Sequence, residues 1–267
     1  MINIVVNTKG GVGKSTVSSQ LLTSYIFSKT GKEVEYFEID DQNESIKNLK
    51  GSNVINATIV KTENIAKFVE DSIMFDSDIV VDVGGNLTAV MFLDKLKMLG
   101  GFIAPTTYYI PLTDGDQDAI NAAETFKMIR VYDKTSKIIY VLNKCTNKSN
   151  QDLLEREFVD FFGNDILDVE TIIKDKKTSY IAVNRNTIYN LAGKLQKTII
   201  ELANESYDEE YKKSAKEYYA DKTNQELYKK VRKLMFLKEQ TTVAGDILNN
   251  EYLSLFKDIE KLQTKED

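Results

Sequence analysis

The sequence contains no histidine and only one cysteine, Cys145. One cysteine excludes a disulfide framework within the chain and a zinc or iron–sulfur site built from several of its own thiolates. Without histidine, histidine-based catalysis and histidine-ligated metals are excluded as well. No apolar run approaches the roughly 18 residues of a membrane span. The first strand pattern begins after a single residue, which leaves no room for a signal peptide, so we expect a cytoplasmic protein.

Positive charge is also in the minority. Lys and Arg number 35 against 41 Asp and Glu, a net charge of −6. This balance excludes a nucleic-acid binder that is basic overall, although local basic patches remain open. Hydrophobic residues make up 42% of the 267 residues, enough for a sizeable core.

Short apolar runs alternate with helical patterns through the first two thirds of the chain. Nearly continuous apolar runs are typical of strands buried on both faces, and their alternation with helices predicts an α/β fold with a mostly parallel twisted sheet flanked by helices. The expected strands are residues 2–7, 34–39, 79–83, 102–106, 138–143 and 166–173. The expected helices between them are residues 14–29, 65–72, 88–98, 117–131 and 151–162.

After about residue 185 the strand signals stop. We expect helices over residues 187–205, 208–241 and 248–262, with a break at Gly245. The predicted organisation is a core of residues 1–204 and a helical C-terminal extension of residues 205–267, packed on the core or on a partner.

A glycine-rich loop, "TKGGVGKST" at residues 8–16, follows the first strand. Glycines let backbone N–H groups turn toward a phosphate, and the helix that begins near Lys14 directs its positive end at the same anion. Lys14 should contact the β- and γ-phosphates, and the Ser15 hydroxyl should ligate Mg²⁺. The pattern predicts a P-loop NTPase; a turn that only connects strand to helix is the alternative. The predicted nucleotide-binding residues are Gly10, Gly11, Val12, Gly13, Lys14, Ser15 and Thr16.

The loop carries a second lysine, Lys9, and "KGGVGKST" resembles the deviant Walker A box of the ParA/MinD ATPases, closest to the small ParA-type partition proteins. The resemblance implies a homodimer that sandwiches two ATP molecules. In that arrangement Lys9 reaches the phosphates held by the other subunit, as an arginine finger supplied in trans would, and takes part in catalysis with Lys14. A solvated loop lysine is the alternative for Lys9.

The second strand ends in "EYFEIDDQNES", where family members carry Asp-x-Asp-Pro-Gln. The resemblance implies that Asp40 belongs to switch I, positions the attacking water and faces Mg²⁺, directly or through water. Glu38 replaces the first aspartate and Asp41 the proline, while Gln42 is retained. Either Asp40 or Asp41 could be the working carboxylate, and we favour Asp40.

Four apolar residues in "SDIVVDVGGN" run into Asp82. This looks like a Walker B aspartate, which would hold Mg²⁺ directly or through water; a structural strand-end aspartate is the alternative. The family often has prolines after this aspartate. Here Gly84 and Gly85 follow, and we expect them to keep a switch II loop flexible.

The strand "IIYVLNKCTN" ends with Asn143. A guanine-reading motif would have an aspartate at the position of Thr146, so the sequence predicts ATP rather than GTP. The resemblance implies that Asn143 contacts the adenine amino group; a plain turn asparagine is the alternative.

The segment "LYKKVRKLMFLK" holds five positive charges and no acid. Such a stripe could contact DNA phosphates, or it could be the solvated face of a packed helix. The tail helix has mixed charges around its apolar stripe, which favours packing over membrane binding, so no membrane contact is expected. The candidate DNA-binding residues are Lys229, Lys230, Arg232 and Lys233.

The expected function is an ATP-dependent dimerising ATPase for plasmid or chromosome partition in a bacterium or archaeon. A ParB-like or other partner would stimulate slow hydrolysis, and the ATP state would bind DNA nonspecifically and associate with the nucleoid. One alternative is a ParA-like ATPase of conjugation or other cargo positioning that does not bind DNA itself. A metabolic P-loop enzyme resembling dethiobiotin synthetase is the other.

Overall fold

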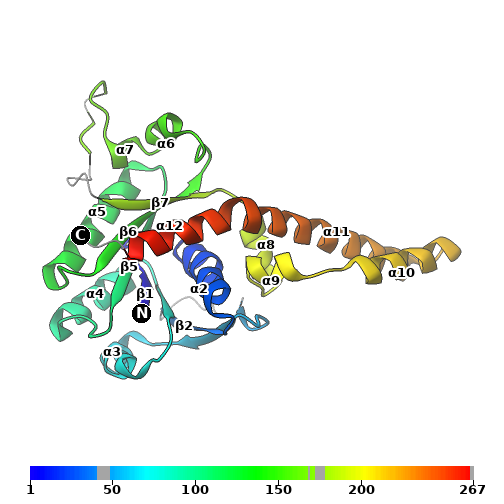
Figure 1. Cartoon of the computed structure of the whole chain (residues 1–267), viewed down its shortest axis with the longest axis horizontal. Coiled ribbons are helices and arrows are strands. Elements are labelled where there is room, and N and C mark those ends of the chain that lie inside the picture. The colour runs from blue at the N-terminus through cyan, green and yellow to red at the C-terminus, as the bar shows by residue number, and fades with distance from the viewer. Residues whose placement is uncertain (41–48, 168, 172–177, 265–267) are drawn as a thin grey trace.

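The computed structural model describes residues 1–40, 49–167, 169–171 and 178–264. Within them, one parallel sheet runs in the order β3-β2-β4-β1-β5-β6-β7 (Figure 1). The predicted parallel sheet with flanking helices, a P-loop NTPase fold, is confirmed. The strands are β1 (Ile2–Val5), β2 (Val34–Ile39), β3 (Ile55–Ile59), β4 (Ile79–Val83), β5 (Thr106–Leu112), β6 (Lys137–Cys145) and β7 (Ser179–Asn184).

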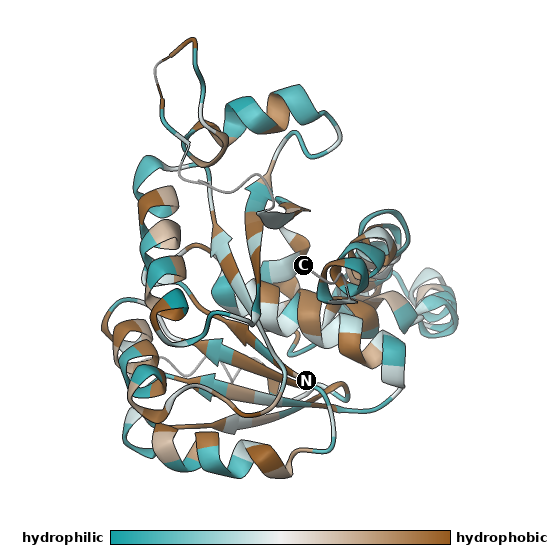
Figure 2. Ribbon diagram, turned by 60° about the vertical axis from the view of Figure 1, so that its left-hand side comes forward, coloured by the Kyte–Doolittle hydropathy of each residue, from teal (hydrophilic) through white to brown (hydrophobic). Residues whose placement is uncertain are grey.

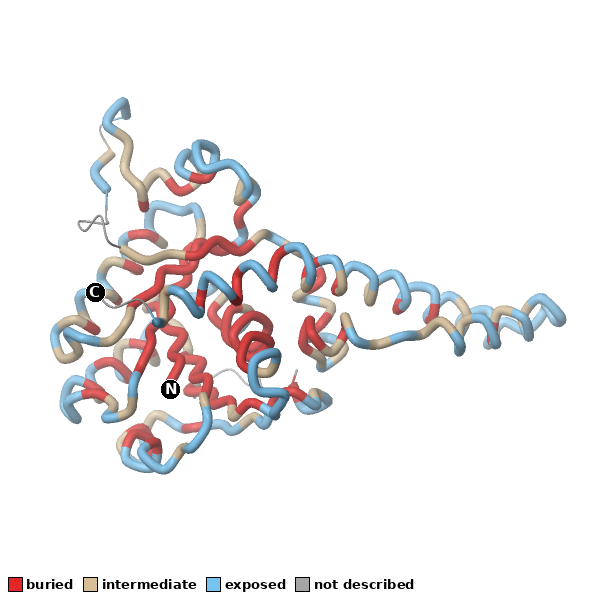
Figure 3. Tube along the Cα trace, in the orientation of Figure 1, coloured by how far each residue is buried: buried red, intermediate tan, exposed pale blue. Residues whose placement is uncertain are grey.

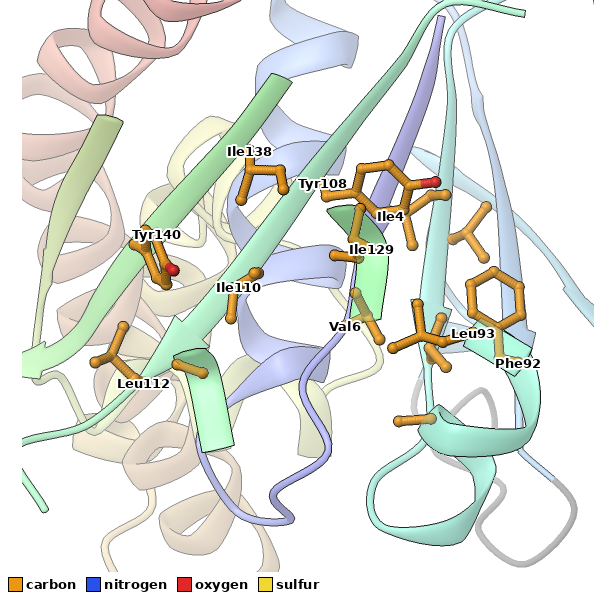
Figure 4. Close-up of a cluster of buried hydrophobic side chains, with 14 of the residues drawn as sticks. Ile4, Val6, Phe92, Leu93, Tyr108, Ile110, Leu112, Ile129, Ile138 and Tyr140 are labelled. Atoms are coloured by element: carbon orange, nitrogen blue, oxygen red, sulfur yellow. The ribbon is translucent and has the colours of Figure 1, made fainter. Parts of the chain in front are cut away.

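One face of the sheet packs against α4 and α5. Successive side chains of a strand point to opposite faces, so Ile4 of β1 enters this layer, as does Val6, the residue after the end of β1. They share a buried cluster with Phe92 and Leu93 of α4 and Ile129 of α5 (Figure 4). The elements between the strands on this side are η3 (Thr62–Asn64), α3 (Ile65–Asp71), η4 (Ser72–Met74), α4 (Leu87–Leu99), α5 (Asp116–Tyr132), α6 (Gln151–Glu157) and α7 (Val159–Phe162).

The opposite face is covered by the helix that follows the glycine-rich loop and by the C-terminal helices. Val5, on the other side of β1 from Ile4, lies in this second buried cluster with Leu21 and Ile199. Coloured by hydropathy, the ribbon shows hydrophobic residues along the strands and on the flanking helices, where they alternate with hydrophilic residues (Figure 2). The elements here are α1 (Lys14–Thr16), the π-helical η1 (Val17–Leu22), α2 (Thr23–Thr30), α8 (Ile188–Lys194) and α9 (Ile199–Asn204).

The C-terminal region consists of a projecting helical hairpin, called the arm below, and a last helical segment that packs on the core. α10 (Asp208–Ala220) and the first half of α11 (Gln225–Ile247) project from the core as a mostly exposed helical hairpin (Figures 1 and 3). The chain then continues without interruption through the π-helical η5 (Leu248–Tyr252) and α12 (Leu253–Thr264). Tyr252, Phe256 and Ile259 are buried in the second cluster, so this part of the extension packs on the core. Within the described residues, no helix is both long and apolar enough to span a membrane.

Two of the strand predictions were wrong. The strand expected at 102–106 lies instead at Thr106–Leu112, which contains Pro111. Proline is normally kept out of central strands because it lacks an N–H donor. β5 pairs with β1 only as far as Tyr109, so Pro111 lies beyond the end of that neighbour.

The described residues of the strand expected at 166–173 form a turn closed by a single bridge between Asn164 and Val169. Ile166 is 94% exposed, so this apolar residue does not mark the buried face of a strand. The strand at this edge of the sheet is β7, and the prediction missed it. It also missed β3, a polar edge strand that is mostly exposed.

The expected break at Gly245 was also wrong. α11 continues through Gly245, and its neighbours Ala244 and Ile247 are buried against the core. A glycine in a helix interior costs about 1 kcal/mol relative to alanine, and packing of the adjacent apolar residues outweighs that cost.

Candidate functional site

The glycine-rich loop opens a cavity at the carboxyl edge of the sheet. β1 leads into the loop, and its neighbour β4 carries Asp82, which lies opposite Val5 in register. Asp40 follows β2, the next strand along, so the strand order brings loop, Asp82 and Asp40 to the same edge. The cavity of about 530 Å³ is of the size that holds small-molecule ligands, roughly 300–1,000 Å³. Its lining includes Gly10, Gly11, Gly13, Lys14, Ser15, Thr16, Asp40, Asp82, Gly84, Gly85 and Lys144.

The loop backbone depends on glycine at two positions. Gly11 and Gly13 have φ of +80° and +91°, the left-handed region that favours glycine. A Cβ on Gly13 would also lie 2.0 Å from Nδ2 of Asn143. This asparagine is buried under the loop and donates from Nδ2 to the Val12 carbonyl at 2.8 Å. Asn143 therefore supports the loop from below, and the predicted adenine contact stays a prediction.

Lys14 is buried in the cavity floor. Its Nζ donates to the carbonyl of Lys9 at 2.7 Å. Burial lowers the pKa of the Lys14 ammonium, and the carboxylates of Asp82 and Asp40 oppose that shift. The Lys14 ammonium is partly shielded from water and faces two carboxylates, so it is suited to bind the phosphate oxygens of a ligand in place of water.

Lys9 is half-buried, and its main chain is fixed on both sides. Its N–H donates to Oδ1 of Asn7 at 2.8 Å, and Asn7 in turn donates to the Pro111 carbonyl at 2.7 Å. The Lys9 carbonyl accepts from Lys14. Among the described residues, the Lys9 ammonium has no hydrogen-bond or ion-pair partner.

Asp82 is 3% exposed and is held by a hydroxyl relay. The Tyr36 hydroxyl donates to Oδ2 of Asp82 at 2.8 Å and lies 3.1 Å from Oγ of Ser18. Burial raises the pKa of Asp82 to about 6, against the effects of the Tyr36 and Ser15 hydroxyls, which lower it. Oδ1 of Asp82 is buried, and no described residue donates to it.

These oxygens fit a magnesium ion. Mg²⁺ binds oxygen ligands and usually takes only one or two carboxylates, with waters and substrate phosphates completing its shell. The unpartnered Oδ1 of Asp82 and the Ser15 hydroxyl lie in one cavity and supply ligands of this kind. A bound Mg²⁺ would neutralise charge on the phosphate oxygens of the ligand.

The glycines after Asp82 permit close approach of three segments. A Cβ on Gly84 would lie 2.8 Å from Oδ2 of Asp40. One on Gly85 would lie 3.1 Å from Cα of Gly10 and 3.2 Å from Nζ of Lys14. The glycine pair thus allows the loop after β4 to lie directly against both the glycine-rich loop and the end of β2.

A β-bulge at the end of β6 directs a third lysine toward the loop. The register with β7 shifts between Asn143 and Cys145, and Lys144 has a φ of +62°. Bulges re-aim side chains next to active sites. Nζ of Lys144 donates to the carbonyl of Gly11 at 3.0 Å.

Residues 3–188 match the family model described as the CobQ/CobB/MinD/ParA nucleotide binding domain. The chain belongs to this family. The resemblance seen in the sequence is therefore confirmed.

Two solved structures are similar to the chain. The MinD cell division protein of Aquifex aeolicus shares 14% identity over 75% of this chain and 89% of its own, with a TM-score of 0.49. A putative plasmid partition protein of Borrelia burgdorferi B31, solved bound to AMPPNP, shares 14% identity over 72% and 88%, with a TM-score of 0.46. No curated protein matches the sequence.

In this MinD/ParA-type domain the predicted loop residues Gly10, Gly11, Gly13, Lys14, Ser15 and Thr16 line one cavity with the two acids Asp40 and Asp82, whereas Val12 is fully buried and Lys9 is not among the lining residues. Their individual roles stay predictions. Asp41 and Gln42 lie outside the described residues. The candidate DNA-binding residues lie apart, on α11 of the arm. Lys229 pairs with Glu226 at 2.8 Å and Lys230 with Glu210 at 3.2 Å, so part of this charge holds the arm together.

Sequence reasoning missed three contributors to the site. Tyr36 lies in a buried strand, and a buried tyrosine hydroxyl needs a polar partner, which was the available signal. Lys144 lies in the segment that was compared with a guanine-binding motif, and a single sequence does not reveal the β-bulge that directs this lysine to the loop. Asn86 has a φ of +50° and donates its N–H to the Thr8 carbonyl at 2.8 Å, a contact set by tertiary structure.

Proposed function

We propose that this chain is a Mg²⁺-dependent ATPase of the ParA type that acts as a homodimer around two ATP molecules. One observation carries the proposal: the glycine-rich loop with Lys14, together with Asp40 and Asp82, surrounds a single cavity. Membership of the MinD/ParA-type family supports nucleotide as the ligand.

Each side chain has a task in this proposal. Lys14 and the loop amides bind the β- and γ-phosphates, while Ser15 and Asp82 hold the metal ion. Asp40 orients the attacking water at the far side of the γ-phosphate. Lys9 extends to the phosphates of the partner subunit, so that the charge of the transition state is stabilised only in the dimer. Catalysis of this kind relies on positioning and electrostatics rather than on a protein nucleophile.

Three alanine variants test these roles by ATP binding, ATP turnover and molar mass in solution. Lys14→Ala should abolish nucleotide binding. Lys9→Ala should bind ATP normally but lose turnover or the dimer, and Asp40→Ala should accumulate an ATP-bound dimer. Lys97→Ala, an exposed lysine on α4, is the control. Unchanged ATP affinity in Lys14→Ala would overturn the loop assignment, and unchanged turnover in Asp40→Ala would shift the role to Asp41.

The biological role we propose is partition of a plasmid or chromosome, with DNA as the track and a ParB-like protein as the stimulating partner. Lys229, Lys230, Arg232 and Lys233 on the arm are the proposed DNA contacts. A second role is favoured by a specific observation. The ion pairs of Lys229 and Lys230 reduce the charge available to phosphates, as expected of an arm that positions a protein cargo without binding DNA.

Fluorescence polarisation of a random-sequence duplex separates the two roles. It is measured at fixed salt with ATP–Mg²⁺ and then ADP–Mg²⁺, because phosphate-driven affinity falls steeply with salt. Binding only with ATP supports partition, and Lys229→Ala/Lys233→Ala should then weaken it and lower the salt slope by about 2. Lys257→Ala/Lys261→Ala on α12 removes the same charge from the same continuous helix and is the control. No binding in either state supports cargo positioning.

A further inference from the structure

Glu251 is a buried carboxylate that the nucleotide-binding residues described above do not include. It lies in η5, beyond residues 3–188 that match the family model. Only 7% of the residue is exposed. Oε1 of Glu251 accepts the backbone N–H of Asn184 at 2.8 Å and lies 3.7 Å from Nζ of Lys148.

These two contacts join two different loops. Asn184 ends β7 and leads toward α8, while Lys148 lies in the loop between β6 and α6. The first part of that β6 loop is held from its other side by Glu157, which accepts the N–H groups of Thr146 and Asn147 at 2.8 and 3.1 Å. Glu251 thus contacts both loops, in addition to the backbone hydrogen bond in which the Arg185 N–H donates to the Cys145 carbonyl at 2.9 Å.

The bridged loops enclose a second, polar cavity of about 670 Å³. It adjoins the phosphate cavity along β6, because Lys144 lines the first cavity and Cys145 the second. The lining that matters here is Asn147, Lys148, Asn184, Arg185, Asn186 and Glu251. Amide, ammonium, guanidinium and carboxylate groups of this kind can hydrogen-bond the edge of a nucleobase.

The π-helical turn explains how Glu251 reaches this position. In η5, Glu251 and its neighbour Tyr252 are both buried, although they are adjacent on the helix. Tyr252 fills the hydrophobic layer over the sheet, and Glu251 turns to the loops. π-turns inside helices occur frequently at functional sites.

We propose that Glu251 is a positioning residue for the adenine base of the bound nucleotide, acting through the β6 and β7 loops that it holds together. The inference rests on the proposed function and adds to it a determinant from the C-terminal helix. The phosphates lie at the glycine-rich loop, so the base extends into the adjoining cavity whose walls Glu251 fixes. Loss of the carboxylate should therefore weaken recognition of the nucleoside part and leave phosphate binding intact.

The experiment compares ATP with inorganic tripolyphosphate, which has the phosphates but no base. Affinities for both are measured by isothermal titration calorimetry with Mg²⁺ on full-length wild type, Glu251→Ala, Glu251→Gln and Glu239→Ala. Glu239 is exposed on the same continuous helix and is the control. Thermal unfolding and circular dichroism verify that each variant is folded.

Glu251→Ala should bind ATP about tenfold more weakly, because the Asn184 N–H would lose its charged acceptor and Lys148 its ion-pair partner. Its tripolyphosphate affinity should equal that of wild type. Glu251→Gln keeps an oxygen for the Asn184 N–H and should recover most of the ATP affinity. Glu239→Ala should match wild type for both ligands.

Two results would overturn the inference alone. One is wild-type ATP affinity in Glu251→Ala, and the other is an equal loss for ATP and tripolyphosphate, which would indicate general destabilisation of the site. If wild type bound neither ligand, the proposed function would fail and the inference with it.

Discussion

The stability of metal-free Asp82→Asn relative to wild type should increase as pH rises toward 8, and the substitution should remove the response to Mg²⁺–ATP. In the folded chain, burial raises the pKa of Asp82 from 3.8 to about 6. The folded state therefore favours the protonated acid. The stability that this preference contributes is complete below pH 3.8 and is lost as pH rises through about 6.

The size of the effect follows from the shift. A shift of about two pKa units, at 1.36 kcal/mol each, corresponds to a loss of about 3 kcal/mol in the free energy of unfolding. This loss is complete at about pH 8, and roughly half of it has occurred at about pH 5. The amide introduced by Asp82→Asn would not titrate, but its oxygen could still accept the Tyr36 hydroxyl that now donates to Asp82. Burial of the new amide N–H lowers the free energy of unfolding of the variant by an amount that does not depend on pH.

The assay is urea unfolding of wild type, Asp82→Asn and the exposed control Asp94→Asn between about pH 5 and 8, with EDTA. The free energy of unfolding of Asp82→Asn minus that of wild type should rise with pH by about 1–2 kcal/mol over this range. Mg²⁺–ATP should then stabilise wild type at about pH 8, by about 2.7 kcal/mol at roughly 100 times its dissociation constant, and not the variant. A difference that stays flat with pH would refute the reasoning, because it would mean that Asp82 is ionised at no cost in the folded state.

Three further predictions concern the surroundings of the loop. Gly85→Ala should keep the fold but lower ATP turnover at least tenfold, because the added Cβ would lie 3.1 Å from Cα of Gly10 and 3.2 Å from Nζ of Lys14. Steady-state ATPase assays measure this against Gly245→Ala in α11, where an added Cβ would meet nothing within 4 Å. Leu87→Asp should abolish the ATP-dependent dimer in light scattering, since Leu87 is 67% exposed at the cavity rim, whereas Met98→Asp, 79% exposed at the other end of α4, should not. Asn7→Ala should leave ATP affinity within a fewfold of wild type but lower turnover toward the level of Lys9→Ala, because Asn7 fixes the Lys9 main chain. Asn3→Ala, in β1 and equally buried, is the matched control, and equal turnover in the two variants would contradict the assignment.

The parts of the site that the sequence predicted are contiguous along the chain. The loop from Gly10 to Thr16 has its strand, turn and helix in one short segment, so local chemistry determines it. Asp40 and Asp82 were also found, because each ends an apolar run and parallel strands bring their carboxyl ends to one edge.

The missed parts depend on packing between distant segments. Tyr36 holds Asp82 across 46 positions of sequence, and Glu251 holds Asn184 across 67. The same holds for β5, which was expected at residues 102–106: its last residues pair with β6 beyond the point where β1 ends. The role of Gly84 and Gly85 was interpreted as flexibility, whereas the structure gives a steric reason, the close approach of Asp40, Gly10 and Lys14.

The geometry also connects the two lysines of the loop. Lys14 has three N–H donors, and one of them holds the Lys9 carbonyl, which leaves two for phosphate oxygens. Asn7 holds the N–H of the same residue. The main chain of Lys9 is thus fixed by Lys14, for which we propose phosphate binding in its own subunit, and by an asparagine that donates to the Pro111 carbonyl of β5. Among the described residues, nothing pairs with the Lys9 ammonium. Under the proposed function this side chain is available to the phosphates of a second subunit, and the cost of ordering its backbone would be met before that subunit binds.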